Sequence, residues 1–439
     1  MTEPNSKQAG WQGGTVWSTR VAIVDAYSTG TYLPGALYRH GTECVHVQSP
    51  NPDIHMTFNA DGFVDYIRHD GDIAATASAL RKHEVSYVIA GAESGVVLAD
   101  RLSAELGTPG NGMSRPTARH NKYEMVMALR DAGLPHAATI LSSDADDIIE
   151  WAETTVGYPI VLKPVASAGA DNVMACSSRA QVLAAHEKIM TSPDRYGIAN
   201  TVVLAQEFLE GGEYFVNTVS RDGRHHTGEI WRYYKRRLSG GNFIYDYDEP
   251  LSPDDPDAKK VGFYTHQVLD ALEIRHWASH TEVMLTARGP ILVECAARLG
   301  GTDPEGQILE INTRCLGTNQ VELLALAVAK PDEFNRLPTT AYRLLEHPRT
   351  VSLINSRELG AAPTYEAMAA IRALPSCAHT VMAHPEGQPL PRTIDVATQP
   401  GYVYLISDDP AQIAADYQKL REIERDYLYD PGQNQGHVA

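Results

Sequence analysis

The stretch SHTEVMLTARGPILVECAARLGG, residues 279–301, predicts two β-strands joined by a short turn. We expect a three-residue turn, Ala287-Arg288-Gly289, because such hairpins favour a glycine in the left-handed position. In that register the side chains of Glu282 and Glu294 lie directly opposite each other on one face. Two carboxylates that close repel each other unless a proton or a cation lies between them.

The paired carboxylates suit a metal site, because such oxygen ligands match Mg²⁺, which completes its shell with water and substrate phosphates. The alternative is two exposed glutamates on an edge hairpin, or a register slipped by one residue. Arg298 ends the same strand and precedes Leu299-Gly300-Gly301. This arginine could offset the charge that develops during phosphoryl transfer, or it could form a surface salt bridge.

Upstream, YPIVLKPVASAGADNV (158–173) places Lys163 at the end of an apolar strand and before a loop of small residues. Burying an unpaired ammonium is costly, so Lys163 either faces an anion or pairs with an Asp or Glu. The loop, which includes Ser167 and Gly169, leaves backbone N–H groups open to phosphates, although many hairpin loops share this composition. In QEFLEGGEY (206–214), a strand runs into a Gly-Gly turn before Glu213. Such a segment could hold adenine and ribose, or be a simple strand and turn.

The rest of the chain predicts an α/β protein. Strand-like and helical patterns alternate up to about Pro116, which indicates a parallel α/β unit. Asp222-Gly223 is a hairpin turn signal. Ser28, Thr29 and Gly30 favour an ordinary turn over a ligand site, and the basic run RYYKRR (232–237) fits a substrate contact or a solvated strand face. Further elements are predicted at about 121–131, 159–163, 202–208, 213–220, 321–329 and 401–408, with a helix from about 410.

Composition limits the classes of function. The formal net charge of −18 disfavours nucleic acid and anionic membranes as main partners. No apolar run is long enough to span a bilayer, and the first residues are polar, so we expect a soluble, cytoplasmic protein. The five cysteines show no C-x-x-C pair, which fits a reducing compartment.

The order of these segments resembles the ATP-grasp superfamily over roughly residues 119–330. The matching stretches are HNKYEMVMALRDAGLP, YPIVLKPVASAGADNV, QEFLEGGEY, HTEVML and ILVECAARLGG. HTEV and ECAARLGG look most like the L-amino-acid ligases, which form dipeptides. Ala296 departs from the pattern, because many members carry asparagine two residues after the second metal glutamate.

The resemblance implies a role for each matching residue. Glu282 and Glu294 are expected to bind Mg²⁺, with Mn²⁺ as an alternative ion. Arg298 is expected to steady the acyl phosphate and its tetrahedral successor. As a separate mechanistic hypothesis, the Gly300-Gly301 backbone could also contact the oxyanion. The expected ATP-binding residues are Lys122, Lys163, Ser167, Gly169, Gln206, Glu207, Phe208, Leu209 and Glu213.

The resemblance also implies a fold and an activity. We expect an ATP-grasp fold with an N-terminal Rossmann-like domain and a C-terminal α+β lobe, divided into a tail (1–18), an N-terminal α/β domain (19–118), a nucleotide-binding core (119–335) and a C-terminal subdomain (336–439). The expected reaction joins a carboxylate, in particular an amino acid, to an amine through an acyl phosphate, in a chain that could form a homodimer. The alternatives are another ATP-grasp ligase or carboxylase with a different substrate, or a catalytically silent nucleotide-binding regulator.

Overall fold

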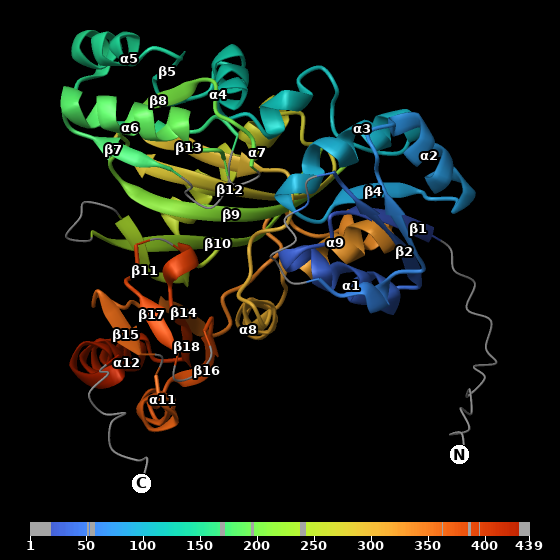
Figure 1. Cartoon of the computed structure of the whole chain (residues 1–439). Helices are drawn as coiled ribbons and strands as arrows, with labels where there is room; N and C mark the ends of the chain where they lie inside the picture. Colours follow the sequence, from blue (N-terminus) through green and yellow to red (C-terminus); the bar gives the residue numbers. More distant parts are fainter. Residues whose placement is uncertain are drawn as a thin grey trace, which may run out of the picture.

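The computed structural model describes residues 19–50, 52, 58–166, 172–194, 197–237, 243–361, 363–384, 388–394 and 396–429 (Figure 1). The predicted tail at 1–18 lies outside these residues. In the N-terminal part, four parallel strands form a sheet in the order β3-β2-β1-β4, so the predicted parallel α/β unit is confirmed. Its elements are β1 (Thr19–Val24), α1 (Leu33–Arg39), β2 (Thr42–Gln48), β3 (Asp65–Arg68), α2 (Ile73–Lys82), β4 (Tyr87–Ala90) and α3 (Val96–Leu106).

A second, smaller sheet follows helix α4 (Lys122–Asp131), which begins at the predicted cap residue Asn121. Its four antiparallel strands lie in the order β5-β8-β6-β7. Side chains of two helices pack against these strands in one apolar core, and Figure 1 shows this unit in green and teal above the large sheet. Its elements are β5 (Thr139–Ser142), α5 (Ala145–Trp151), β6 (Ile160–Lys163), β7 (Met174–Cys176), α6 (Arg179–Thr191) and β8 (Val203–Glu207).

The largest sheet has eight strands in the order β13-β12-β9-β10-β11-β14-β18-β16. Because β14, β18 and β16 continue this sheet, the C-terminal region is joined to the core by strand pairing (Figure 1). The predicted domain boundaries stay predictions. The strands are β9 (Gly212–Arg221), β10 (Arg224–Arg237), β11 (Phe243–Pro250), β12 (Trp277–Thr286), β13 (Gly289–Ala296), β14 (His347–Ser352), β16 (Cys377–Met382) and β18 (Gly401–Ser407).

Helices cover parts of both faces of the large sheet. Tyr214 and Val216 of β9 share an apolar core with Val261 and Val268 of α7, on one face. Val219 lies on the opposite face, in a core that includes α9. Side chains alternate between the two faces along β9, and the rest of that second face carries polar side chains. The helices are α7 (Pro256–Ala271), α8 (Gln307–Leu316), α9 (Gln320–Ala329), α10 (Pro331–Phe334), α11 (Tyr365–Arg372) and α12 (Pro410–Ile423), and β15 (Leu359–Ala361) pairs with β17 (Pro389–Pro391). No helix among the described residues is both long and apolar enough to cross a membrane.

The β12–β13 hairpin confirms the predicted pairing of Glu282 with Glu294 but not the predicted turn. Thr286 pairs with Gly289, so the turn contains two residues and not three. The register then shifts by one residue, with Val293 as the extra residue of a β-bulge, and this shift returns Glu294 to Glu282. The two errors in the predicted hairpin therefore cancel.

Candidate active site

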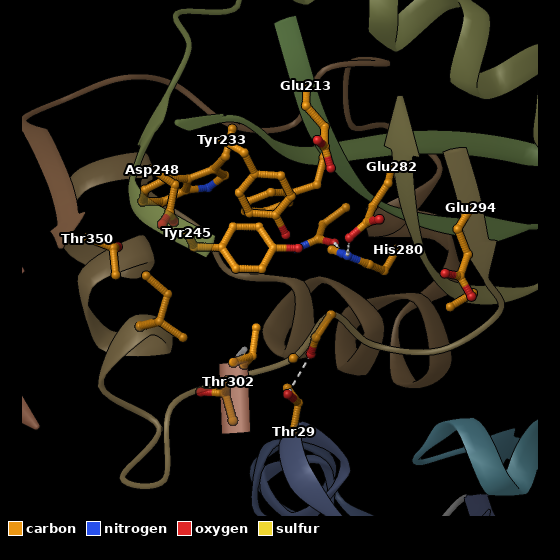
Figure 2. A pocket seen from close by; sticks show the side chains of 18 of the residues that line it. Thr29, Glu213, Tyr233, Tyr245, Asp248, His280, Glu282, Glu294, Thr302 and Thr350 are labelled. Carbon is orange, nitrogen blue, oxygen red and sulfur yellow. Dashed lines mark hydrogen bonds and ion pairs between the residues drawn. The ribbon is translucent and has the colours of Figure 1, made fainter. Parts of the chain in front are cut away.

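A cavity of about 440 Å³ lies on the polar face of the large sheet (Figure 2). Its floor follows the two-residue period of the strands, because every second side chain points to the same face. β9 contributes Glu213, Phe215 and Asn217; β12 contributes His280 and Glu282; β13 contributes Glu294 and Ala296; and β10 contributes Glu229, Trp231, Tyr233 and Lys235.

Glu282 and Glu294 face this cavity from neighbouring strands. The Lys122 ammonium lies 2.8 Å from Glu294 Oε1, and His280 Nε2 lies 3.7 Å from Glu282 Oε1. Burial would raise the pKa of Glu282, but the proximity of His280, Lys235 and Arg298 outweighs burial and lowers it. Glu282 is therefore held as a carboxylate, which is the form that accepts cations.

Lys163 lies at the end of β6, 6% exposed, and also lines the cavity. Its ammonium donates to Gln206 Oε1 at 3.0 Å. Burial, reinforced by the charge of Lys122, lowers the pKa of Lys163 to about 8. Among the described residues, Lys163 forms no ion pair with Asp or Glu, so the alternative of a structural salt bridge is wrong there.

Arg298 lies where β13 leaves the sheet. Its Nε donates to Glu93 Oε2 at 3.1 Å, and its Nη1 donates to the carbonyl of Leu299 at 2.8 Å. Burial would raise the pKa of Glu93, but His120, whose Nδ1 lies 3.6 Å from Glu93 Oε1, and the charge of Arg298 outweigh it and hold the pKa below its ordinary value. The predicted help from the Gly300 N–H is wrong in this structure, because that group donates to Gln320 Oε1 at 2.8 Å.

Glu213 forms an ion pair with Lys235, whose Nζ lies 2.7 Å from Glu213 Oε1. Burial raises the pKa of Glu213. Lys235 belongs to the basic run 232–237, in which alternation separates the residues. Tyr233 and Lys235 line the cavity, whereas Arg236 points away and pairs with Asp246. Part of that run therefore contributes to the site, and part to the other face of the sheet.

The comparisons with known proteins agree with this geometry. A family model for the ATP-grasp domain matches residues 156–304. Dapdiamide A synthase from Enterobacter agglomerans is 32% identical over 419 residues, which cover 93% of this chain and 96% of that protein. The chain belongs to the ATP-grasp ligases.

Other relatives support the same placement. The L-arginine-specific L-amino acid ligase of Bacillus subtilis is 26% identical over 224 residues, 49% of this chain and 52% of that protein. The crystal structure of an L-amino acid ligase from Bacillus licheniformis shares the fold with a TM-score of 0.70 at 18% identity, covering 92% of this chain and 97% of that one. This ATP-grasp protein is thus an ATP-dependent ligase that joins a carboxylate to an amine.

Not every residue expected to bind ATP lines the cavity of this ligase. Glu207 accepts from Ala138 N at 2.9 Å and from Arg288 Nη2 at 2.8 Å, so its side chain ties the small sheet to the β12–β13 turn. Phe208 and Leu209 are half-buried in the connection between β8 and β9. Ser167 and Gly169 lie outside the described residues.

Sequence reasoning missed a buried hydrogen-bond network behind the paired carboxylates. His280 Nδ1 lies 2.7 Å from Asn217 Oδ1, and Asn217 Nδ2 donates to Glu229 Oε1 at 2.6 Å. Trp231 Nε1 and Asn312 Nδ2 donate to the other oxygen of Glu229. The network fixes the His280 ring beside Glu282. The period of two from Glu213 to Asn217 was the signal that could have identified part of it.

Thr29 and Glu93 also reach the site, although they come from the N-terminal part. Thr29 Oγ1 donates to the carbonyl of Gly300, so the turn at 28–30 does more than connect two elements. Glu93 holds Arg298, as described above. No sequence pattern linked either residue to the carboxylates, because both contacts depend on how the N-terminal sheet packs against the core.

Proposed function

We propose that this ligase activates the carboxylate of an amino acid as an acyl phosphate and passes it to the amine of a second substrate, giving a dipeptide or related amide, ADP and phosphate. One observation carries the proposal. Two opposed carboxylates, Glu282 and Glu294, share a cavity with four cations, among them Lys122, Lys163 and Arg298. The names of the amino-acid-ligase relatives support an amino acid as the acid substrate.

The residues present fit Mg²⁺, which the family typically uses. Among the described residues, no three His, Cys, Asp or Glu side chains are placed to hold a metal ion together. Glu282 and Glu294, paired across β12 and β13, are the candidate protein ligands. One or two carboxylates are what Mg²⁺ takes from a protein when substrate phosphates complete its shell. Lys122 beside Glu294 supports this assignment, because the pair already attracts a cation. Bound there, the ion would supply charge neutralisation at the phosphates.

We assign the nucleotide contacts by position. Lys122 and Lys163 would bind the phosphates of ATP, with Ser167 and Gly169 of the neighbouring loop. Gln206, Glu207, Phe208 and Leu209 would border the adenine, and Glu213 would bind the ribose hydroxyls. The ammonium of Lys163 is supported in this role because it is buried without a carboxylate partner among the described residues.

In the first step, an oxygen of the substrate carboxylate attacks the γ-phosphorus of ATP, and the bond to the ADP oxygen breaks. In the second step, the neutral amine attacks the acyl carbon, a proton leaves the nitrogen, and phosphate departs. Arg298 would donate to the oxygen that becomes negative in the tetrahedral intermediate. Glu93 would keep the guanidinium in place, because it already binds Nε.

The test is release of ADP that depends on both substrates, with the joined product identified by mass spectrometry. AMP and pyrophosphate in place of ADP and phosphate would rule out the acyl-phosphate route. Activity on carboxylic acids that are not amino acids would favour the alternative of a different ATP-grasp ligase or carboxylase.

Replacing Glu294 with Gln should lower kcat by at least about a hundredfold, because one charged metal ligand is lost. The matched control is Glu150→Gln on α5, an exposed glutamate outside the cavity, which should keep full activity. Circular dichroism would check that both variants fold. A folded Glu294→Gln enzyme with normal turnover would disprove the metal assignment.

A further inference from the structure

One end of the cavity is lined by hydrogen-bond acceptors that the reaction above does not use. Asp248 of β11 lies between Tyr233 of β10 and Thr350 of β14, as direct neighbours across the strands. Figure 2 shows Asp248 and Thr350 on the opposite side of the cavity from Glu294, with Tyr233 and Tyr245 between them.

Asp248 faces the cavity because of a β-bulge in β11. Tyr245 and Asp248 are three residues apart, so in a regular strand they would point to opposite faces. The register shifts between the Tyr234–Tyr247 and Lys235–Tyr245 pairs, which leaves Asp246 as the extra residue. Both Tyr245 and Asp248 therefore line the cavity. Asp246 points away, to Arg236 and Arg421.

The Asp248 carboxyl forms no ion pair with any described residue. The cations that line the cavity already have carboxylate or amide partners: Lys235 binds Glu213, Lys122 binds Glu294, Arg298 binds Glu93 and Lys163 binds Gln206. Burial, reinforced by the charges of Glu249 and Glu229, raises the pKa of Asp248 to about 8. A carboxyl in this position would gain most from a positively charged ligand.

Two further polar atoms in the same cavity have no hydrogen bond of normal geometry among the described residues. Asn312 is 3% exposed; its amide N–H donates to Glu229, and its Oδ1 has no hydrogen-bond partner among the described residues. Thr350 is 7% exposed, and its Oγ1 lies near Asp248 without a hydrogen bond of normal geometry. Burying polar atoms unpaired is unfavourable, so these atoms indicate a polar ligand, and Asn312 Oδ1, which can only accept, requires one that donates a hydrogen bond.

The surrounding side chains suit a cation. Trp231, Tyr233 and Tyr245 line this part of the cavity, and aromatic faces attract ammonium and guanidinium groups. The Lys235 ammonium already lies 5.7 Å from the centroid of the Tyr233 ring and 4.8 Å from that of the Tyr245 ring, so both rings accept a cation in this structure. Burial raises the pKa of both tyrosines, so their hydroxyls stay neutral. An end with one carboxyl, neutral acceptors and aromatic rings matches a group that carries several N–H donors and a positive charge.

The sheet also sets the spacing between this end and Glu282, the candidate metal ligand beside which the substrate carboxylate would be activated. β12, which carries Glu282, and β11, which carries Asp248, are separated by β9 and β10. Neighbouring strands lie about 4.8 Å apart, so three strand spacings separate the backbones at these two residues by roughly 14 Å. An α-ammonium is only one carbon atom from its own carboxylate, so a cation bound at Asp248 belongs to a longer side chain.

We infer that Asp248, with Asn312 and Thr350, binds a positively charged side-chain group of one amino-acid substrate, and so selects diamino or guanidino acids. This inference rests on the proposed function. It adds no step to the reaction, but assigns to β11 the role of distinguishing cationic from neutral substrates.

The experiment compares matched substrates. L-ornithine, L-lysine and L-arginine are each tested against L-norvaline, L-norleucine and L-citrulline, in pairwise combination with uncharged amino acids, by ADP release. We expect the wild-type enzyme to favour the cationic member in kcat/KM by about ten- to hundredfold, as for a charge-assisted hydrogen bond. Asp248→Asn should remove most of this preference by raising KM for the cationic substrate. Asp254→Asn, an exposed aspartate outside the cavity, is the control and should retain the preference.

Two further arms make the result decisive. Asp248→Glu keeps the charge on a longer side chain and should shift the preference from lysine towards ornithine. Binding of lysine and norleucine to the wild type and Asp248→Asn, measured by calorimetry with ADP and Mg²⁺ present, tests the site without turnover. If no pair releases ADP but lysine binding still depends on Asp248, the proposed function fails and the site stands.

Three results would overturn the inference. One is an equal preference for cationic and neutral substrates in the wild type. Another is an equal fall in kcat/KM for cationic and neutral substrates in Asp248→Asn, which would mean that the residue is structural. The third is a kcat/KM for norleucine that falls in Asp248→Asn, while kcat/KM for the norleucine analogue without the α-amino group does not change. That result would place the α-ammonium, and not a side chain, at Asp248.

Discussion

Asp248 also affects the stability of the protein. Its pKa of about 8 in the folded chain exceeds the ordinary value of 3.8, mainly because of burial. The folded state therefore binds a proton that the unfolded state has lost, and stability falls as the pH rises from about 4 to about 8. The groups that interact with it electrostatically are Glu249, Glu229, Thr350 and the tyrosines Tyr233, Tyr245, Tyr402 and Tyr404, and none of these is a cation.

We predict that Asp248→Asn flattens this dependence. The melting temperature of the variant relative to that of the wild type should rise steadily from pH 5 to pH 8, because the amide carries no charge at any pH. Differential scanning calorimetry across this range measures the effect. A difference between the two proteins that stays constant with pH would show that Asp248 does not hold the proton, and Asp254→Asn should give such a constant difference.

At the scale of single elements, turns were easier to predict than registers. The Asp222-Gly223 signal was correct, and both residues have positive φ, 53° and 77°. An uninterrupted hairpin from this turn would place Arg232 opposite Glu213. A bulge at Gly228 shifts the pairing by one residue, so Tyr233 and Lys235 enter the cavity instead. Nothing in the sequence distinguishes Gly228 from the other 33 of the chain's 34 glycines.

Replacing glycine with alanine should have opposite effects on stability at two positions, one in this hairpin turn and one in α1. Gly223→Ala should destabilise the protein by about 1–2 kcal/mol, because its φ of 77° is unfavourable for a residue with a Cβ. Gly35→Ala in α1 should stabilise it by about 0.5–1 kcal/mol, because its Cβ would meet only Arg39 Nη1, at 3.9 Å. Urea denaturation of both variants compares them. Changes of the same sign would contradict the argument.

At the scale of the whole molecule, three distant parts of the chain contribute to one site. Lys163 and the carboxylate pair were predictable, because each lies within a local motif. Thr29, Glu93, Asp248 and Thr350 were not, because their positions depend on long-range pairing and packing. β11 pairs with β14 across the intervening α7 to α10 region, and only that pairing brings Thr350 beside Asp248. The substrate-selecting end of the cavity therefore follows from tertiary structure more than from local sequence.

The C-terminal helix α12 supports that end of the cavity through Arg421. The guanidinium donates to both the side chain and the carbonyl of Asp246, the bulged residue of β11, and to the carbonyl of Ser352 in β14. Its Nη1 donates to Glu424 at 2.6 Å. Removing one partner of a buried, charged network leaves the other charges unpaired, which is strongly destabilising. Arg421 thus links the C-terminal helix to the bulge that turns Asp248 inwards.

We expect Arg421→Ala to lower the free energy of unfolding by about 3 kcal/mol or more. Arg425→Ala is the matched control, because that arginine is exposed and its one ion pair within the described residues is with its neighbour Asp426, so a change within about 0.5 kcal/mol is expected. Denaturant titration of both variants measures the difference. If Arg421→Ala unfolds like Arg425→Ala, α12 does not hold the bulge. If it is destabilised but keeps the wild-type preference between lysine and norleucine, the bulge keeps its shape without Arg421, and strand pairing alone orients Asp248.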